Sequence, residues 1–325
     1  MVDTNIVGAI NLALKEEMER NPDVVVLGED VGKDGGVFRA TAGLIDKFGP
    51  ERVLDTPLSE SGIVGFAIGM ALKGLRPVAE IQFIDFIWPA ADQIISEAAK
   101  FRYRSGGEFT VPMVIRSPYG GGVKGAHYHS QSPESIFAHT AGIKVVVPSN
   151  PYDAKGLLTA AIRDPDPVLF MEPKRIYRAF TQEVPEGDYT VPIGEATVVR
   201  EGSDVTLASF GAMLHVTMDA ALMAEEEHGI SCEVIDLKSI VPLDIETIGK
   251  SVTKTGRFIS VTEAPRTAGF SAELSALVGE RWIEYMESPI MRVTGYDTPF
   301  PMILENQYLP TPERVLSKII ESYNY

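Results

Sequence analysis

The chain has 325 residues, of which 45% are hydrophobic and 23% charged, a globular composition that excludes a disordered chain. Its net charge is −16, and a chain this acidic is a poor general binder of nucleic acid or anionic membrane, because phosphate contacts need clustered cations. One cysteine, Cys232, excludes an internal disulfide and a cysteine-based zinc site. No apolar stretch is long enough to span a bilayer, and the acidic N-terminus resembles no signal or transit peptide, so we expect a cytoplasmic protein.

Short β-branched runs alternate with helical patterns through the first half of the chain. Several of these runs are apolar on both faces, as strands of a buried parallel sheet are. The predicted strands are Val24–Leu27, Arg52–Leu54, Val78–Phe83, Met113–Arg116, Lys144–Val147 and Val168–Met171. The predicted helices are Ile6–Arg20, Ile63–Lys73, Trp88–Tyr103 and one from Asn150-Pro151 to about Arg163. This alternation predicts an α/β fold with right-handed crossovers.

Residues 181–193 interrupt the alternation with two prolines, a glycine and three acids, which is typical of a linker. The alternation then resumes, so we expect a second α/β domain after the linker. Its predicted strands are Val205–Ser209, Cys232–Leu237, Phe258–Thr262 and Met291–Val293. Its predicted helices are Leu214–Glu227, Ile245–Lys254, Ser271–Ile283 and Pro312 to about Ser322.

The first candidate site is the segment LDTPLSESGIVG, residues 54–65. A predicted strand ends near its start, and Glu60 lies where the next helix begins, beside Leu58. Because parallel sheets bind ligands at the carboxyl ends of their strands, we expect Glu60 to face an apolar pocket that suits a proton-exchanging group. A favourable interaction with the helix dipole explains Glu60 equally well. The glycines that follow, Gly62, Gly65 and Gly69, predict a helix face for close packing.

The second candidate site is RSPYGGGVKGAHYHSQSPE, residues 116–134. It contains a G-x-G-x-x-G match at Gly120–Gly125, but no helix pattern opens at the third glycine and no acid follows about 20 residues later. We therefore interpret it as a glycine loop. His127 and His129 follow it, and a metal pair is the weaker interpretation because any third ligand would be arbitrary. A proton-transfer or substrate-positioning role suits His129 better, and an exposed surface histidine remains open for His127.

The third candidate site is AEIQFIDFIWPAADQI, residues 79–94. Gln82 and Phe86 lie four residues apart across a strand end and a helix start. This pair suits a planar heterocyclic ligand. The Gln82 amide would hydrogen-bond the edge of the ligand, and the Phe86 ring would pack on its face. Packing in the protein core explains Phe86 without any ligand.

A set of motifs spread over the chain resembles one known family. The motifs are LGEDVG (27–32), GGVFRAT (35–41), DTPLSESGIVGFAIGMA (55–71), IQFIDF (81–86), RYRSGG (102–107), IRSPYGGGVKG (115–125), HSQSPE (129–134), GIKVVVPSNPYDAKGLL (142–158) and VPLDIETI (241–248). The similarity runs from about residue 4 to the C-terminus. In these motifs the chain resembles the beta chain of the decarboxylase component of 2-oxo acid dehydrogenases.

The resemblance implies two α/β domains with mainly parallel sheets. These are a transketolase-like pyrimidine-binding domain at 1–185, a linker at 186–194 and a transketolase C-terminal-like domain at 195–325. It implies an alpha-two beta-two heterotetramer in which thiamine diphosphate is shared with the alpha chain, which also carries magnesium. The chain lacks the Gly-Asp-Gly motif for magnesium and diphosphate, in agreement with that division. The implied reaction is oxidative decarboxylation of a 2-oxo acid with reductive acylation of the acyltransferase's lipoyl group.

The resemblance also assigns roles to residues of this chain. Glu60 matches the carboxylate that hydrogen-bonds the aminopyrimidine ring of thiamine diphosphate, and His129 matches a histidine that handles the intermediate and the incoming lipoyl group. Positions around the pyrimidine match Leu58, Gln82 and Phe86. A potassium ion, held in relatives largely by backbone carbonyls, matches Met113, Ala161, Ile162, Asp164 and Asp166. The acidic C-terminus implies docking of the acyltransferase's basic binding domain on paired beta chains.

Other functions remain open from the sequence. A beta subunit of an acetoin dehydrogenase is one alternative, and a non-catalytic assembly subunit, which would keep only remnants of the pocket, is another. A one-chain sugar-phosphate enzyme would need the diphosphate domain, for which this chain is too short. Intact Glu60, Gln82 and His129 favour catalysis together with an alpha chain. Pyruvate, branched-chain 2-oxo acids and 2-oxobutyrate all remain possible substrates, and YHSQSPE favours the branched-chain class slightly.

Overall fold

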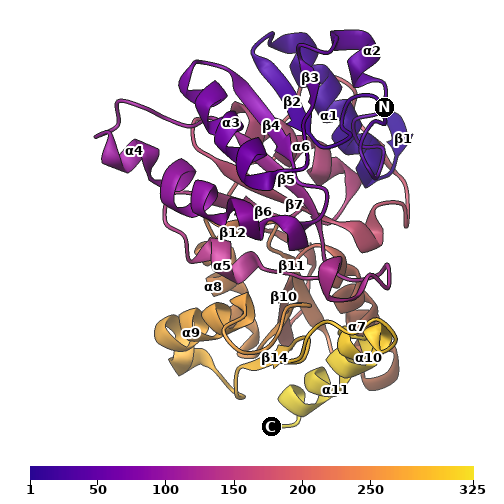
Figure 1. Cartoon of the computed structure of the whole chain (residues 1–325). Helices are drawn as coiled ribbons and strands as arrows, with labels where there is room; N and C mark the ends of the chain where they lie inside the picture. The colour runs from indigo at the N-terminus through magenta and orange to yellow at the C-terminus, as the bar shows by residue number, and fades with distance from the viewer. The chain divides into compact units, whose positions relative to one another are not determined.

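The computed structural model describes all residues from Met1 to Tyr325 and divides into two compact units (Figure 1). Unit 1 combines 1–119 with 136–193, and unit 2 combines 120–135 with 194–325. Both units are α/β with mainly parallel sheets, so the predicted fold class is confirmed. None of the helices is long and apolar enough to cross a membrane.

The sheet of unit 1 consists of parallel strands in the order β6-β7-β5-β4-β2-β3. Nearly every residue in these strands is buried, as expected for a parallel sheet with helices on both faces. Their bounds are β2 Val24–Gly28, β3 Val53–Asp55, β4 Arg76–Glu80, β5 Val114–Tyr119, β6 Lys144–Val146 and β7 Val168–Pro173. Two short strands that were not predicted, β1 (Val2–Thr4) and β8 (Gln182–Val184), pair antiparallel beside it.

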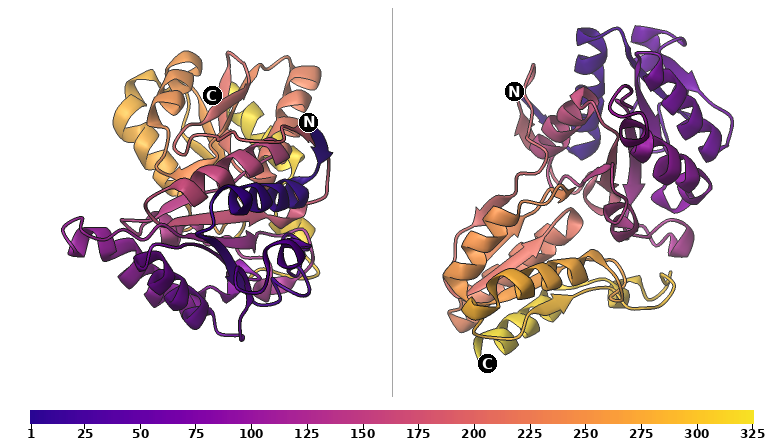
Figure 2. Two further views of the ribbon diagram at one scale, coloured as in Figure 1. Left: turned by 90° about the horizontal axis from the view of Figure 1, so that it is seen from above. Right: turned by 90° about the vertical axis from the view of Figure 1, so that its left-hand side faces the viewer.

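The long helices of unit 1 begin at side-chain caps. Helix α1 (Ile6–Arg20) starts where the Asn5 side chain accepts the Gly8 N–H, and α6 (Pro151–Arg163) starts where Asn150 accepts the Asp153 N–H. Helices α1 and α6 pack along each other on one face of the sheet, and α3 (Glu60–Leu72) lies on the other face (Figure 2). The shorter helices are α2 Leu44–Phe48, α4 Phe101–Arg104 and α5 Glu134–Ala138.

The segment predicted as a helix over 88–103 is helical throughout, but it is not one regular α-helix. A 3-10 turn at Trp88–Ala90 is followed by a π-helical stretch at Gln93–Glu97 and another 3-10 turn at Ala98–Lys100, before α4 begins. The apolar spacing of the sequence indicates a helix but does not distinguish these helix types. The strand predicted over 78–83 is also too long, because β4 ends at Glu80 and a 3-10 turn at Ile84–Phe86 follows.

The sheet of unit 2 has the order β14-β13-β10-β11-β9, and only β9 runs antiparallel to its neighbour. Helix α7 packs on α11 and α8 packs on α9, with the sheet between the two pairs (Figure 1). The strands of this sheet are β9 Thr197–Arg200, β10 Val205–Ser209, β11 Cys232–Asp236, β13 Phe258–Val261 and β14 Met291–Val293, and the short strand β12, Ser239–Val241, is not part of it. The helices are α7 Ala212–His228, α8 Ile245–Thr255, α9 Phe270–Trp282, α10 Glu305–Tyr308 and α11 Pro312–Tyr323.

Candidate active site

The carboxyl ends of three adjacent strands of unit 1 meet around Gly28. In the parallel register, Gly28 of β2 lies opposite Asp55 of β3 on one side and opposite Glu80 of β4 on the other. The Asp55 carboxylate accepts the backbone N–H groups of Gly32 at 2.6 Å and Lys33 at 3.1 Å. These bonds fix the loop after β2 against the end of β3, the sheet edge at which ligands of such folds bind.

Glu60 lies at the first position of α3, directly after this edge. It is half-buried, its carboxylate accepts no hydrogen bond within the chain, and the nearby Leu58 side chain is 72% exposed. Partial burial, together with the charges of Asp30 and Glu60, raises the pKa of Glu29. The surroundings of Glu60 within this chain are therefore more acidic and more open than the apolar pocket expected from the sequence.

Gln82 and Phe86 also lie beyond the end of β4, in unit 1. The Gln82 amide donates from Nε2 to Asp30 Oδ2 at 3.1 Å, and its Oε1 accepts no hydrogen bond within the chain. The half-buried Phe86 ring meets Phe83 edge to face, with 5.8 Å between ring centroids. Gln82 thus presents an unused acceptor, and the aromatic cluster keeps Phe86 from turning freely.

A buried ion network lies under this edge and was not foreseen from the sequence. The Arg116 guanidinium on β5 bonds Glu172 of β7 and Glu80 of β4, and all three side chains are at most 3% exposed. Tyr177 donates its hydroxyl to Glu172 Oε2 at 2.5 Å. Burial raises the pKa of Glu80, and the Arg116 charge only partly opposes this shift. The sequence signals were two charged residues, Arg116 and Glu80, within strands that are mostly apolar.

His129 belongs to unit 2, in the loop after β5. It follows a 3-10 turn, Ala126–Tyr128, and its Nδ1 lies 3.3 Å from the backbone oxygen of Gly125. A Cβ at position 125 would lie 2.5 Å from His129 Cβ, so only glycine allows this close approach. His127 and His129 do not share a strand face, which removes the geometry considered for a metal pair.

The glycine loop before His129 is tied to unit 2 by two carboxylates. Glu263 Oε2 accepts the Gly121 N–H at 2.8 Å, and Glu305 Oε2 accepts the Lys124 N–H at 3.0 Å. At Gly120 φ is +81°, and a Cβ there would lie 2.5 Å from the Glu263 carboxylate. The loop is therefore anchored at both ends, which holds the following histidine in a defined place.

Glu134, after His129, is a titratable group whose burial the sequence did not reveal. Its side chain is 1% exposed, and neither carboxylate oxygen has a hydrogen-bond partner. Burial, with a smaller contribution from the Glu263 charge, raises the pKa of Glu134 to about 8. This carboxyl group therefore carries its proton at neutral pH.

The oxygens that the resemblance assigns to a potassium ion already have cationic neighbours. Arg76 Nη1 donates to the backbone oxygens of Ile162 at 2.8 Å and Asp164 at 3.2 Å. Lys144 and Arg102 pair with the carboxylates of Asp164 and Asp166. The Met113 oxygen accepts the Val168 N–H, and the Ala161 oxygen accepts the Asp164 N–H. As they lie here, these residues do not fit a further cation.

No group of three or more His, Cys, Asp or Glu side chains in the chain is arranged to hold a metal ion. Gly62 and Gly69 lie on the exposed side of α3 together with Phe66, whereas Gly65 faces Gln93. Nothing lies within 4 Å of a Cβ built at Gly69. The close-packing face expected from the three glycines is thus largely uncovered in the single chain.

Comparison with known families places both units. Residues 3–179 match the family model of the transketolase pyrimidine-binding domain, and residues 194–315 match that of the transketolase C-terminal domain. The chain is 56% identical to the mitochondrial 2-oxoisovalerate dehydrogenase subunit beta of Dictyostelium discoideum, over 94% of this chain and 83% of that protein. The chain belongs to the family of 2-oxo acid dehydrogenase beta subunits. The resemblance stated from its motifs is confirmed.

Other members of the family are similar over nearly their whole length. The 2-oxoisovalerate dehydrogenase subunit beta of Bacillus subtilis is 53% identical, covering 95% of both chains. The pyruvate dehydrogenase E1 component subunit beta of Acholeplasma laidlawii is 50% identical, covering 98% of both. A solved structure, titled split gene transketolase, inactive beta4 tetramer, superimposes with a TM-score of 0.81 at 24% identity over 99% of both chains, which shows the shared fold.

This family of 2-oxo acid dehydrogenase beta subunits depends on thiamine diphosphate, and the residues of unit 1 fit one end of that cofactor. Glu60 and Gln82 Oε1 are acceptors without partners in the chain, and the exposed Leu58 and half-buried Phe86 are apolar residues of the same two segments. The buried Thr56 hydroxyl, in the same segment, also has no hydrogen-bond partner. A flat heterocycle with ring nitrogens and an amino group suits such a set.

Proposed function

We propose that this chain forms the active site of a 2-oxo acid dehydrogenase decarboxylase together with an alpha subunit and that a branched-chain 2-oxo acid is its substrate. Four of its relatives carry the name 2-oxoisovalerate dehydrogenase subunit beta, at 51–56% identity. The catalytic role is supported above all by the position of Glu60. Its carboxylate has no partner in the chain and lies at the start of α3, beside the carboxyl edge of the sheet.

The cofactor supplies an electron-accepting carbon centre when it is bound, and the residues of this chain orient it and move protons. Glu60 is the acceptor for an N–H on the ring of the cofactor, because its carboxylate has no hydrogen-bond partner within the chain. Gln82 Oε1 is an acceptor for the amino group. Leu58 and Phe86 would supply apolar surface to the faces of the bound ring.

His129 is proposed to act on the second half-reaction. A proton on Nδ1, donated to the Gly125 oxygen, makes Nε2 the basic nitrogen of the ring. Such a histidine can accept a proton from, or donate one to, an incoming lipoyl sulfur during acyl transfer. The anchored loop before it keeps this nitrogen in place.

The proposed assembly is an alpha-two beta-two heterotetramer with contacts between beta chains. The exposed apolar face of α3, with Phe66 at 59% exposure, together with Leu58 is the surface we assign to subunit contacts. The alpha chain supplies magnesium and diphosphate contacts. The C-terminal end, with Glu321, is assigned to docking of the basic domain of the lipoyl-bearing acyltransferase. Glu321→Gln should weaken that docking, as high salt does, because both reduce the attraction between opposite charges.

The proposal keeps the predicted domains 1–185 and 195–325 with the linker 186–194, and a cytoplasmic location. The two matches to family models leave residues 180–193 between them, which supports a linker in this region. Potassium is not part of the proposal, because Arg76, Lys144 and Arg102 already pair with the oxygens concerned.

Reconstitution with the alpha subunit tests the proposal. The complex should decarboxylate 2-oxoisovalerate with a higher kcat/KM than pyruvate, 2-oxobutyrate or acetoin, measured with an artificial electron acceptor. The chain alone should turn over none of them. Preference for pyruvate or acetoin would correct the substrate, whereas an equally active complex with Glu60→Ala would remove the catalytic role.

A further inference from the structure

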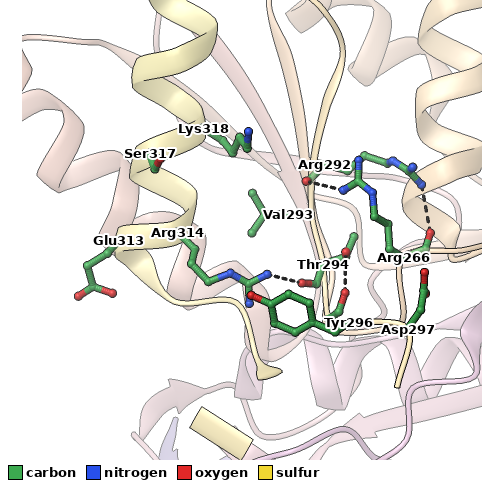
Figure 3. A pocket seen from close by; sticks show the side chains of 11 residues that line it. Arg266, Arg292, Val293, Thr294, Tyr296, Asp297, Glu313, Arg314, Ser317 and Lys318 are labelled. Atoms are coloured by element: carbon green, nitrogen blue, oxygen red, sulfur yellow. Dashed lines mark hydrogen bonds between the residues drawn. The ribbon is translucent and has the colours of Figure 1, made fainter. Parts of the chain in front are cut away.

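A cleft in unit 2 has a lining unlike the rest of this acidic chain. It has a volume of about 510 Å³ and lies between the end of β14, the loop that follows it, and α11 (Figure 3). Four basic and two acidic side chains line it, although the chain as a whole carries a net charge of −16. The charged lining residues are Arg266, Arg292, Arg314, Lys318, Asp297 and Glu313.

The three arginines of the cleft are held by neutral acceptors. Arg266 Nη1 donates to the backbone oxygen of Arg292, and Arg292 Nη1 donates to the backbone oxygen of Arg266, each at 3.2 Å. Arg314 donates to the backbone oxygens of Tyr308, Leu309 and Thr294 at 2.7–3.1 Å. None of the three forms an ion pair with a carboxylate within 4 Å, and the Asp297 charge only partly offsets those of Arg266 and Arg292.

The acids in the lining are bound elsewhere. Asp297 accepts the Thr267 N–H at 2.8 Å and the Thr267 hydroxyl at 2.7 Å, and Glu313 accepts from Thr311 at the start of α11. Lys318 pairs with Glu321. Burial and the neighbouring Arg266 charge lower the pKa of Arg292, and Asp297 only partly opposes this. The cleft thus keeps a local excess of positive charge.

We propose that this cleft binds a small molecule that carries a phosphate group. Two guanidinium groups held side by side present several N–H donors to one anion, an arrangement that matches the oxygens of phosphate. Figure 3 shows Arg266 and Arg292 on one side of the cleft and Arg314 with Lys318, from α11, on the other, so cations line both walls.

The remaining walls fit a ligand larger than inorganic phosphate. Arg314 stacks over the Tyr296 ring, 4.8 Å from its centroid, and Tyr296 remains 50% exposed. A flat aromatic wall beside clustered cations suits a phosphate ester with a planar group, such as a nucleotide. The cleft volume lies within the range of about 300–1,000 Å³ that small-molecule sites occupy.

Titration calorimetry on the full chain, alone and in complex with the alpha subunit, tests the proposal with inorganic phosphate, pyrophosphate and ATP as probes. We expect one saturable site per chain. Arg292→Gln and Arg266→Gln should each weaken binding about tenfold to hundredfold, the range for loss of a charged hydrogen bond. Arg292→Lys keeps the positive charge but loses the planar pair of N–H donors. Its affinity for the probe should lie between those of the wild type and Arg292→Gln.

Arg281→Gln is the matched control, because Arg281 is exposed on unit 2, lies outside the cleft and loses the same charge. It should bind all three probes as the wild type does. Unchanged affinity in Arg292→Gln, or equal losses in Arg281→Gln, would show non-specific attraction and overturn the proposal. So would the absence of saturable binding at millimolar ligand, or tighter cleft-dependent binding of an acidic peptide than of any phosphate probe. Turnover of 2-oxo acids is measured separately and does not decide this outcome.

Discussion

The Arg116 guanidinium and the Glu172 carboxylate meet in two parallel hydrogen bonds, Nε to Oε1 at 2.7 Å and Nη2 to Oε2 at 2.9 Å. Both side chains are at most 1% exposed, and they join neighbouring strands β5 and β7 below the candidate site. Since Arg116 also bonds Glu80 of β4, one guanidinium links the carboxyl ends of three parallel strands. The cationic centre allows two carboxylates to be buried beside the acidic residues that surround Glu60.

Loss of one carboxylate from this network should destabilise the fold strongly. Glu172→Ala leaves Arg116 buried without its bidentate partner, and such breaks cost about 3–5 kcal/mol. Glu19→Ala, which removes an exposed pair with Lys47, should cost at most about 1 kcal/mol. Urea unfolding of both variants measures the difference. Similar midpoints for the two would show that the buried pair does not stabilise the chain.

Glu60→Gln should keep the fold and abolish proton exchange at the cofactor. The side chain keeps its shape, and the carboxylate has no hydrogen bond in the chain to lose. In the reconstituted complex, deuterium exchange at the reactive carbon of thiamine diphosphate should slow by about 10²–10⁴-fold, the usual contribution of a general acid or base. Glu51→Gln, an exposed acid of the same unit, is the control and should exchange normally. Normal exchange in Glu60→Gln would exclude the proposed role.

His129→Ala should impair lipoyl acylation much more than cofactor binding. The histidine lies in the anchored loop of unit 2, and its loss should reduce acyl transfer by about 10²–10⁴-fold. His127→Ala is a close control, since His127 is an exposed histidine in the same loop. Single-turnover transfer to a free lipoyl domain and calorimetry with thiamine diphosphate separate the two effects. A change in cofactor affinity alone would contradict the assignment.

The sequence predicted best those elements that local chemistry defines. Helix α6 begins as predicted because the Asn150-Pro151 pair is a strong local start signal. Helix α1 was predicted from the spacing of its apolar residues, and the structure adds the Asn5 cap at its start. Glu60, Leu58 and Gln82 could be selected because each lies in a short motif at a strand end. The Arg116–Glu172 pair could not, because its members are 56 residues apart and only the strand order brings them together.

The edge strand β9 and the cleft of unit 2 were not predicted, because neither has a distinctive local sequence pattern. The strand β9 has alternately exposed and half-buried residues without a continuous apolar run, so its residues resemble a loop. The arginines of the cleft come from three segments, and each alone resembles an ordinary surface cation. These arginines are unusual because they donate to backbone oxygens and pair with no carboxylate. A sequence pattern does not indicate which acceptor an arginine will bind.

A bulky side chain at Gly69 should block assembly but not folding. A Cβ at this position meets nothing within 4 Å, and the residue is exposed on α3, so Gly69→Leu should leave the chain alone folded and slightly more stable. Close helix packing in the complex would then be prevented. Sedimentation of the chain with and without the alpha subunit measures this. Ala276→Leu, at an exposed helix position of unit 2, should assemble normally, and normal assembly of Gly69→Leu would remove α3 from the subunit contacts.

The buried carboxyl group of Glu134 should make the stability of the chain fall as the pH rises. Burial raises the pKa of Glu134 from 4.5 in its ordinary state to about 8. Between these values the folded chain keeps a proton that the unfolded chain has lost. The free energy of unfolding therefore decreases as the pH rises, by roughly 1.4 kcal/mol for each pH unit in this window. Below this window both states are protonated, and the loss of stability is absent.

Glu134→Gln tests this, because its side chain cannot ionise. Its thermal midpoint should fall less than that of the wild type between about pH 5 and about pH 9. Glu134→Asp, which keeps a carboxyl group, is the control and should retain the steep decline. Parallel midpoint curves for the wild type and Glu134→Gln would show that Glu134 does not titrate in this range.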